Sequence, residues 1–109
     1  MIPFDDFAKV ELRVGTILEA SPIEESEKLI KLKVDLGDPA PAGPRQILAG
    51  IKKWYKAEQL VGKQVIIVAN LEPRMMMGLE SQGMLLAADF DKPIILKPSA
   101  KVPNGTKIR

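Results

Sequence analysis

Cysteine and histidine are both absent from this chain of 109 residues. Without cysteine there is no disulfide bridge and no thiolate nucleophile, and without histidine the chain lacks the commonest general base and a usual zinc ligand. The eight glycines form neither a Walker-type phosphate loop nor a dinucleotide fingerprint. We therefore expect a protein that is not an enzyme and that binds no metal ion or cofactor.

Long apolar runs are missing as well. No run approaches the roughly 20 residues that a membrane-spanning helix needs, and Met1 is not followed by a basic and apolar leader. Hydrophobic residues make up 46% of the chain and charged residues 28%, which is typical of a folded soluble protein. We expect one domain over residues 1–109, located in the cytoplasm and making no contact with a membrane.

The net charge is small, but the charges are unevenly distributed. The formal total is +2. Residues 1–27 hold seven acids and two bases, a balance of −5, whereas residues 28–74 hold nine bases and four acids, a balance of +5. A basic middle of this kind predicts a surface for a polyanion if the bases share one face. Solvated strand faces would give the same count, so charge alone leaves both interpretations open.

The clearest strand signal lies in residues 29–36. Ile30 and Leu32 alternate with Lys31 and Lys33, and this period of two continues to the end of the segment. A helix would scatter these residues over all its faces. The segment is therefore expected to be a strand with one apolar and one charged face.

Similar patterns predict further strands and two short helices. The other expected strands are Val10–Ala20, with a bend at Gly15, and Gln46–Ala49, Val65–Ala69, Met84–Ala88 and Pro93–Leu96. The expected helices are residues 4–7 and 52–61. A helix between the third and fourth of five antiparallel strands is the arrangement of the five-stranded oligonucleotide/oligosaccharide-binding (OB) barrel. The predicted fold class is therefore an all-β OB-fold barrel.

The two expected helices carry four of the five aromatic side chains. Phe4 and Phe7 are expected to cover an open end of the core. Trp54 and Tyr55 are expected to pack in the core rather than to stack on bases.

The ligand of an OB barrel binds across the second and third strands and the loops beside them. Here that face would carry Lys31 and Lys33, and residues 70–83 would form one flanking loop. Four of the five methionines lie in or next to this loop. A methionine cluster either fills gaps in the core or forms an adaptable contact surface, and the pattern does not decide between these.

Several short motifs follow one another along the chain. They are Leu12-Arg13-Val14-Gly15, Glu27-Lys28-Leu29, Val34-Asp35-Leu36-Gly37, Asn70-Leu71-Glu72-Pro73-Arg74 and Glu80-Ser81-Gln82-Gly83-Met84. Together they resemble the tRNA-binding domain family, which includes C-terminal domains of methionyl-tRNA synthetases, free-standing tRNA-binding proteins and CsaA-type secretion chaperones. The resemblance implies an OB barrel that recognises tRNA by shape, and a homodimer formed through a C-terminal extension beyond the barrel. It also implies a methionyl-tRNA synthetase catalytic chain as a partner.

The same resemblance implies roles for individual residues. Lys28 and Arg74 would attract phosphates, and arginine presents a forked set of donors that suits a phosphate. Ser81 would make a polar contact with the RNA backbone, Asn70 would shape the loop, and Met84 would pack against a ribose or base. Four of these residues also have a structural alternative: Lys28 could be a solvated strand start, Asn70 a turn former, Ser81 a hydrogen-bonding group within the loop, and Met84 a core residue.

The chain departs from the family pattern in ways that reduce positive charge. Glu72, Met75 and Met77 stand where the family usually carries basic residues, and residues 23–27 are acidic. Fewer phosphate contacts predict weaker RNA binding with a shallower salt dependence. The alternative function is a CsaA-type peptide-binding secretion chaperone, because an adaptable apolar patch suits unfolded polypeptide better than phosphate.

Overall fold

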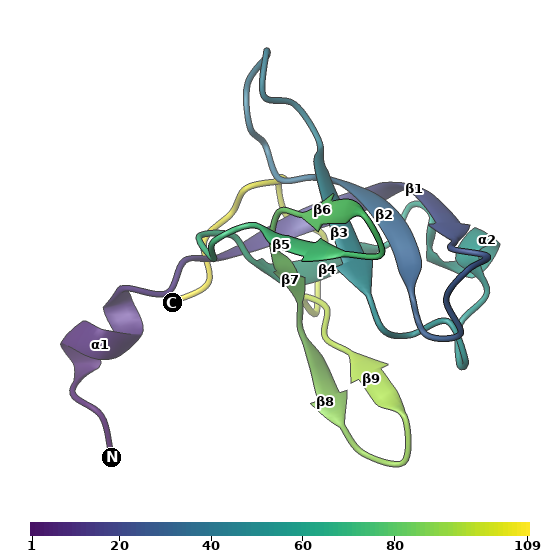
Figure 1. Ribbon diagram of the computed structural model, residues 1–109. Coiled ribbons are helices and arrows are strands. Elements are labelled where there is room, and N and C mark those ends of the chain that lie inside the picture. Colours follow the sequence, from purple (N-terminus) through teal and green to yellow (C-terminus); the bar gives the residue numbers. More distant parts are fainter.

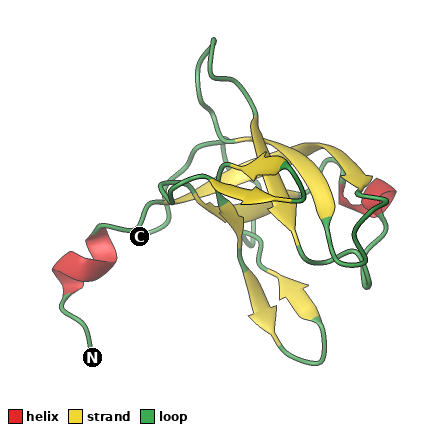
Figure 2. Ribbon diagram, in the orientation of Figure 1, coloured by secondary structure: helices red, strands yellow, loops and turns green.

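The computed structural model describes every residue from 1 to 109 and contains two short helices and nine strands (Figure 1). The helices are α1 (Phe4–Ala8) and α2 (Ala57–Leu60). The strands are β1 (Leu12–Pro22), β2 (Ile30–Asp35), β3 (Arg45–Ala49), β4 (Gln64–Val68), β5 (Arg74–Met76), β6 (Leu79–Ser81), β7 (Met84–Leu85), β8 (Ala87–Asp89) and β9 (Pro93–Ile95). The two helices lie at opposite ends of the molecule (Figure 2). Neither is long or apolar enough to cross a membrane.

Five antiparallel strands form a nearly closed barrel in the order β3-β2-β1-β4-β7. The residues before β7 bridge the gap to β3. The Leu48 N–H donates to Ser81 Oγ at 3.0 Å, and the Gln82 N–H donates to the Gln46 carbonyl at 2.8 Å. The core inside the barrel comprises Ile17, Ile30, Leu32, Val34, Leu36, Ile47, Ala49, Ile51, Leu60, Val65, Ile67 and Ala69. The predicted all-β OB-fold barrel, with a helix between its third and fourth strands, is confirmed.

Strand β1 holds the barrel together because it pairs with two neighbours along its length. Its first part, Leu12–Thr16, pairs with β4, and its second part, Thr16–Pro22, pairs with β2. The register with β2 shifts between Ile17 and Glu19, where the strand bends. One long bent strand therefore connects both halves of the sheet.

The C-terminal tail occupies the edge of β1 that β2 leaves free. The Val14 N–H donates to the Thr106 carbonyl at 2.9 Å, and the Gly105 N–H donates to the Val14 carbonyl at 2.7 Å. The Ile108 N–H donates to the Leu12 carbonyl at 2.9 Å. The last residues of the chain are thus part of the barrel wall, because they satisfy backbone groups that an edge strand would expose.

Two hairpins occur where the sequence predicted a loop and a single continuous strand. The expected loop at residues 70–83 contains the hairpin β5–β6. The expected strand Met84–Ala88 is divided: β7 pairs with β4 in the barrel, whereas β8 pairs with β9. The β8–β9 hairpin extends away from the barrel (Figure 1). The prediction of one continuous strand was wrong because an apolar run does not reveal a change of pairing partner.

Helix α2 is much shorter than the predicted helix at residues 52–61. The N–H groups of Trp54 and Tyr55 both donate to the Ile51 carbonyl, at 3.0 and 3.1 Å, which closes a turn. Lys56 then has an extended backbone with ψ of 138°, which interrupts helical geometry until α2 begins. Tyr55 packs against the core as predicted, whereas Trp54 is 45% exposed and its predicted core position was wrong.

Helix α1 stands away from the barrel, at the left of Figure 1. It has no buried residue, and Phe4 is 76% exposed. The two phenylalanine rings contact each other with centroids 6.3 Å apart. The prediction that Phe4 and Phe7 cover an open end of the core was therefore wrong.

The close approach of β1 and β2 at Gly15 predicts a large effect of a small substitution. A Cβ on this residue would lie 2.7 Å from side-chain atoms of Val34 and Leu36 and 2.9 Å from the Asp35 carbonyl oxygen. Gly15→Ala is expected to lower the free energy of unfolding by about 1–3 kcal/mol, because a crowded core must distort. Urea denaturation measures this change. Gly50→Ala is the control, since nothing lies within 4 Å of its Cβ position, and equal losses for both variants would contradict the prediction.

Candidate nucleic-acid interface

The outer face of β2 presents Lys31 and Lys33. Lys31 lies opposite Leu48 and Lys33 lies opposite Gln46 in the pairing of β2 with β3. Both lysine residues are half-buried, and neither forms an ion pair. The rigid sheet thus holds two lysines without ion pairs on the face that OB barrels use for ligands, with the exposed Glu19 of β1 opposite Lys33.

The β5–β6 hairpin lies beside this lysine-bearing face. Gln46, which pairs with Lys33, donates from its side-chain amide to the Glu80 carbonyl at 2.9 Å. The hairpin turn consists of Met77 and Gly78, both with positive φ, of 51° and 75°. Such a turn matches the twist of the two strands. Met77 is unusual in it, because residues with a side chain rarely adopt the left-handed backbone conformation.

Arg74 begins β5 and is exposed without an ion pair. Arg74 lies opposite Ser81 on the hairpin, and Met75 lies opposite Glu80. Met75 is 64% exposed and Met77 is 54% exposed. The hairpin therefore presents an unpaired guanidinium together with two exposed methionines. Such a surface can combine charge attraction to a phosphate with contacts to an apolar or planar group.

Asn70 and Ser81 use their hydrogen-bonding capacity within the protein. The Asn70 side chain donates to the Lys9 carbonyl at 2.7 Å and accepts from the Glu11 N–H at 2.8 Å, which holds the N-terminal segment against the barrel. Ser81 is 3% exposed, and its hydroxyl accepts from the Leu48 N–H and donates to the Gly83 carbonyl at 3.0 Å. These contacts position the ends of the loop and the hairpin.

Lys28 and Met84 lie at the borders of the same region. Lys28 is exposed two residues before β2, where its N–H donates to Ser26 Oγ at 3.1 Å. Met84 begins β7 opposite Val68 and is 47% exposed. Neither side chain is part of the core, so both are accessible to a ligand.

Two of the basic side chains in residues 28–74 bind groups of the protein itself. Lys52 Nζ donates to the carbonyls of Ile23 and Ser26, at 2.7 and 2.6 Å, and so holds the β1–β2 connection. Arg45 pairs with Asp38 through Nε at 2.8 Å. The sequence contained no signal for these roles, because the partners lie far away along the chain.

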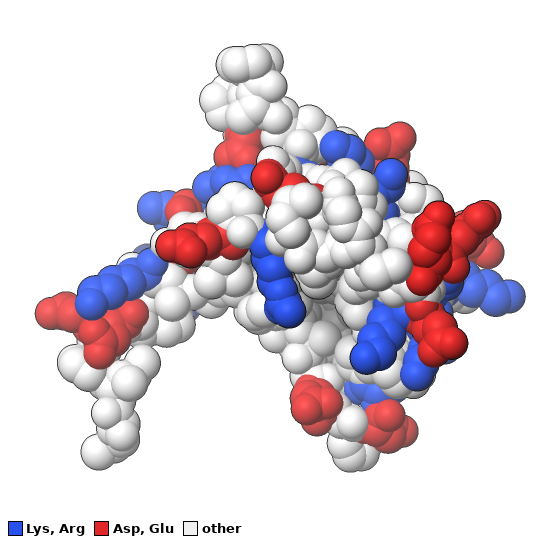
Figure 3. Space-filling model, viewed as in Figure 1, with Lys and Arg blue, Asp and Glu red and all other residues white.

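Acidic side chains gather over the β1–β2 connection, at the right of Figure 3. The connection carries three exposed acids, Glu24, Glu25 and Glu27. The surface over the β5–β6 hairpin is mostly uncharged in the same view. Negative charge therefore lies at one border of the lysine-bearing face.

A network of one acid between two arginines joins three parts of the barrel. Asp38 lies 3.0 Å from Arg13 and 2.8 Å from Arg45, and all three side chains are largely buried. Arg13 also pairs with Glu11 at 2.8 Å, and Arg45 donates to the Ala69 carbonyl. Burial raises the pKa of Asp38, but the hydrogen bonds from Arg45 and Arg13 outweigh it and hold this pKa below its ordinary value. The sequence suggested no such role for these residues.

Comparison with known proteins identifies the family. The family model described as "Putative tRNA binding domain" matches residues 12–107. This chain belongs to the tRNA-binding domain family. The methionine–tRNA ligase of Methanothrix thermoacetophila is 54% identical over 110 residues, which cover 100% of this chain and 16% of the ligase. That of Thermococcus kodakarensis is 49% identical over 99% of this chain and 14% of the ligase.

Solved structures of the tRNA-binding domain family agree with the fold. A MetRS-related protein from Pyrococcus horikoshii has a TM-score of 0.88 and 35% identity, covering 100% of this chain and 98% of that one. The chaperone CsaA from Bacillus anthracis has a TM-score of 0.86 and 33% identity, covering 100% and 99%. The chain spans about one sixth of the length of the ligases, but nearly the full length of these two proteins.

The network around Asp38 predicts a defined loss of stability in acid. Because the native pKa of Asp38 lies below that of the unfolded chain, its ionised form stabilises the fold fully above about pH 4, and this stabilisation is lost as the pH falls through the native pKa. Asp38→Asn is expected to cost about 2 kcal/mol at pH 7 and much less near pH 2. Urea denaturation at both pH values measures this loss in the free energy of unfolding. Asp91→Asn, at an exposed and unpaired site, serves as control, and a pH-independent cost for Asp38→Asn would refute the assignment.

Proposed function

We propose that residues 1–109 form a single tRNA-binding domain that grips the sugar-phosphate backbone of folded RNA without catalysing a reaction. The observation that carries this proposal is the set of unpaired cations on adjoining surfaces: Lys31 and Lys33 on β2, and Arg74 on the hairpin anchored beside them. Positive side chains on a rigid sheet bind phosphates by shape, without reading bases.

The proposal divides the predicted site residues into two groups. Lys28, Lys31, Lys33 and Arg74 supply charge, with Arg74 able to hold a phosphate in a fork, while the exposed Met84 packs against a ribose or base. Two residues act indirectly. They are Asn70 and Ser81, whose polar atoms already bind protein groups. Their substitution would weaken RNA binding by displacing the N-terminal segment or the hairpin.

The domain is proposed to serve a methionyl-tRNA synthetase, as part of its chain or as a free-standing partner in the cytoplasm. Supporting this, the ligase relatives share up to 54% identity over the whole of this chain, and the MetRS-related protein has nearly the same length. Such a domain raises the local concentration of tRNA near the catalytic chain, since linked sites bind with a high effective concentration.

Salt titrations of tRNA binding test the proposed RNA surface. Arg74→Ala is expected to weaken binding of unfractionated tRNA roughly tenfold at low salt. Lys31→Gln/Lys33→Gln is expected to flatten the slope of log K against log salt by about 0.7–0.9 for each phosphate that the variant no longer neutralises. The matched control is Lys63→Gln/Lys97→Gln, which removes the same charge from the residue before β4 and from the segment after β9. No saturable binding by the unmodified chain, or equal losses in both double variants, would refute the proposal.

A peptide-binding chaperone function of the CsaA type is the second candidate. It is favoured by the exposed apolar side chains of Leu71, Met75, Met77 and Met84. Met75→Gln/Met77→Gln distinguishes the two functions, because methionine contacts matter more to unfolded polypeptide than to phosphate. Suppressed aggregation of a model unfolded protein, lost in this variant and unaffected by added tRNA, would support the chaperone function instead.

We further propose that two copies of the chain form a dimer through α1 and the β8–β9 hairpin. Both elements lie outside the barrel and expose large apolar side chains, among them Phe4, Phe7 and Phe90. Exposed large apolar side chains on projecting elements favour association.

Molecular mass in solution tests this dimer. The unmodified chain is expected to have twice the monomer mass of 12.0 kDa. Phe4→Ser/Phe7→Ser should give a folded monomer, since these side chains are not part of the core. Trp54→Ser removes an exposed aromatic side chain near α2 and should leave the dimer intact. A monomeric unmodified chain would end the proposal.

A further inference from the structure

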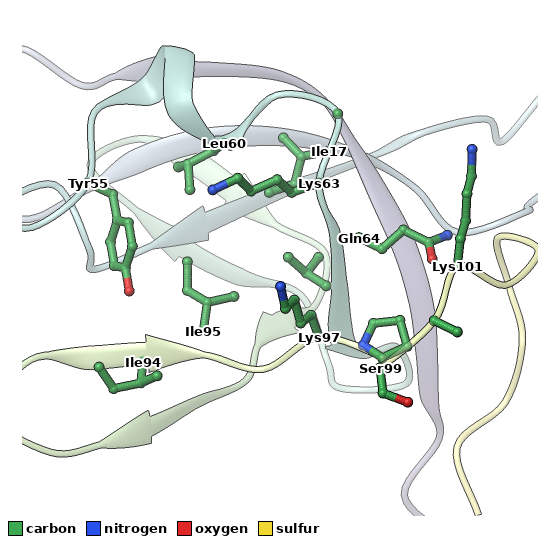
Figure 4. Close-up of a pocket in the computed structure, with 14 residues that line it drawn as sticks. Ile17, Tyr55, Leu60, Lys63, Gln64, Ile94, Ile95, Lys97, Ser99 and Lys101 are labelled. Carbon is green, nitrogen blue, oxygen red and sulfur yellow. The ribbon is translucent and has the colours of Figure 1, made fainter.

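A cavity of about 540 Å³ lies between the end of the barrel at α2 and the segment that follows β9 (Figure 4). Its floor is apolar and lies over core residues of several elements. Ile17 of β1, Leu60 of α2 and Val65 of β4 are fully buried beneath it. Ile95 of β9 and Pro98 after it are partly exposed and present apolar surface to the cavity. A volume of this size lies within the range of small-molecule sites, which is roughly 300–1,000 Å³.

Lysines are the only charged residues that line this cavity. They are Lys63, Lys97 and Lys101, and none of them forms an ion pair or a side-chain hydrogen bond. In Figure 4 the amino groups of Lys63 and Lys97 point over the cavity, whereas Lys101 points away from it. Two unneutralised positive charges therefore face an apolar floor whose lining includes no acidic residue.

Tyr55 forms one wall of the cavity and is held in place by its own contacts. Its hydroxyl donates to the Pro93 carbonyl at 2.7 Å, and Lys92 Nζ lies 5.7 Å from the centroid of its ring. This hydroxyl thus already donates its hydrogen bond to a group of the protein. The wall is preformed, so a ligand would bind without first ordering this side chain.

We propose that this cavity binds a small amphiphilic anion. The apolar body of the ligand lies against Ile95 and Pro98, and its single acidic group lies between Lys63 and Lys97. A neutral apolar molecule would leave the lysines without a counter-charge, and a bare inorganic anion would leave the floor without a partner. Removal of apolar surface from water supplies most of the binding, and the lysines select the charged end.

This site is separate from the proposed RNA surface. The cavity is lined by residues of β1, β4, α2 and the segment around β9, whereas the RNA surface uses β2 and the β5–β6 hairpin. The proposal therefore does not depend on whether the chain binds tRNA. Each site also supplies the control for the other, because each contains a pair of lysines that the other lacks.

Fluorescence titration with 8-anilinonaphthalene-1-sulfonate tests the site, since this probe has an apolar body and one anionic group. The unmodified chain is expected to bind the probe and enhance its fluorescence. Lys63→Gln/Lys97→Gln should weaken this binding by about fivefold or more, because it removes two positive charges that attract the sulfonate. Lys31→Gln/Lys33→Gln, with the same change of net charge, should leave it unchanged. Both substituted pairs are at least partly exposed, and urea denaturation verifies that each variant is folded.

Competition against the bound probe defines the ligand class. Octanoate is expected to displace the probe more effectively than octanol, which has the same chain length and no charge, and inorganic phosphate should not displace it. The proposal is overturned if the Lys63→Gln/Lys97→Gln variant binds the probe as well as the unmodified chain does. It is also overturned if octanol competes as well as octanoate, or if phosphate alone displaces the probe.

Discussion

The barrel depends on the pairing of one strand, β1, with three partners. Its first part binds β4 on one edge and the C-terminal tail on the other, and its second part binds β2. This arrangement requires β1 to bend and to lie very close to β2 at Gly15, where no side chain fits. Backbone groups along β1 are thereby satisfied, so the sheet needs few further connections to close.

Closure of the sheet also decides which charges reach solvent. Arg13 and Arg45 enclose Asp38, and Lys52 binds carbonyls of the β1–β2 connection. These cations stabilise the fold and are not available to a polyanion. The positive charge that remains is carried by separate groups on different faces of the barrel, which gives the proposed RNA surface and the proposed anion cavity different positions and different chemistry.

The exposed apolar residues outside the core are also separated by type onto different elements. Methionines gather on the β5–β6 hairpin, whereas phenylalanines lie on α1 and the β8–β9 hairpin. Methionine adapts to varied partners because its side chain is flexible, and phenylalanine suits a fixed interface because its ring is rigid. The two groups therefore suit the different partners proposed for them: a variable ligand at the hairpin and a second copy of the chain at the projecting elements.

Local pattern in the sequence determined much of the fold. The alternation around Lys31 and Lys33 specifies a strand with one buried face, because side chains of a strand point alternately to its two sides. The order of the expected strands and helices predicted the barrel type, and the resemblance of the motifs to a known family implied the same fold. Tertiary structure alone decided the pairing of Asp38 with two arginines, the occupied hydroxyl of Ser81 and the cavity beneath Lys63. These features join residues that are distant along the chain, and periodicity reports only on neighbours.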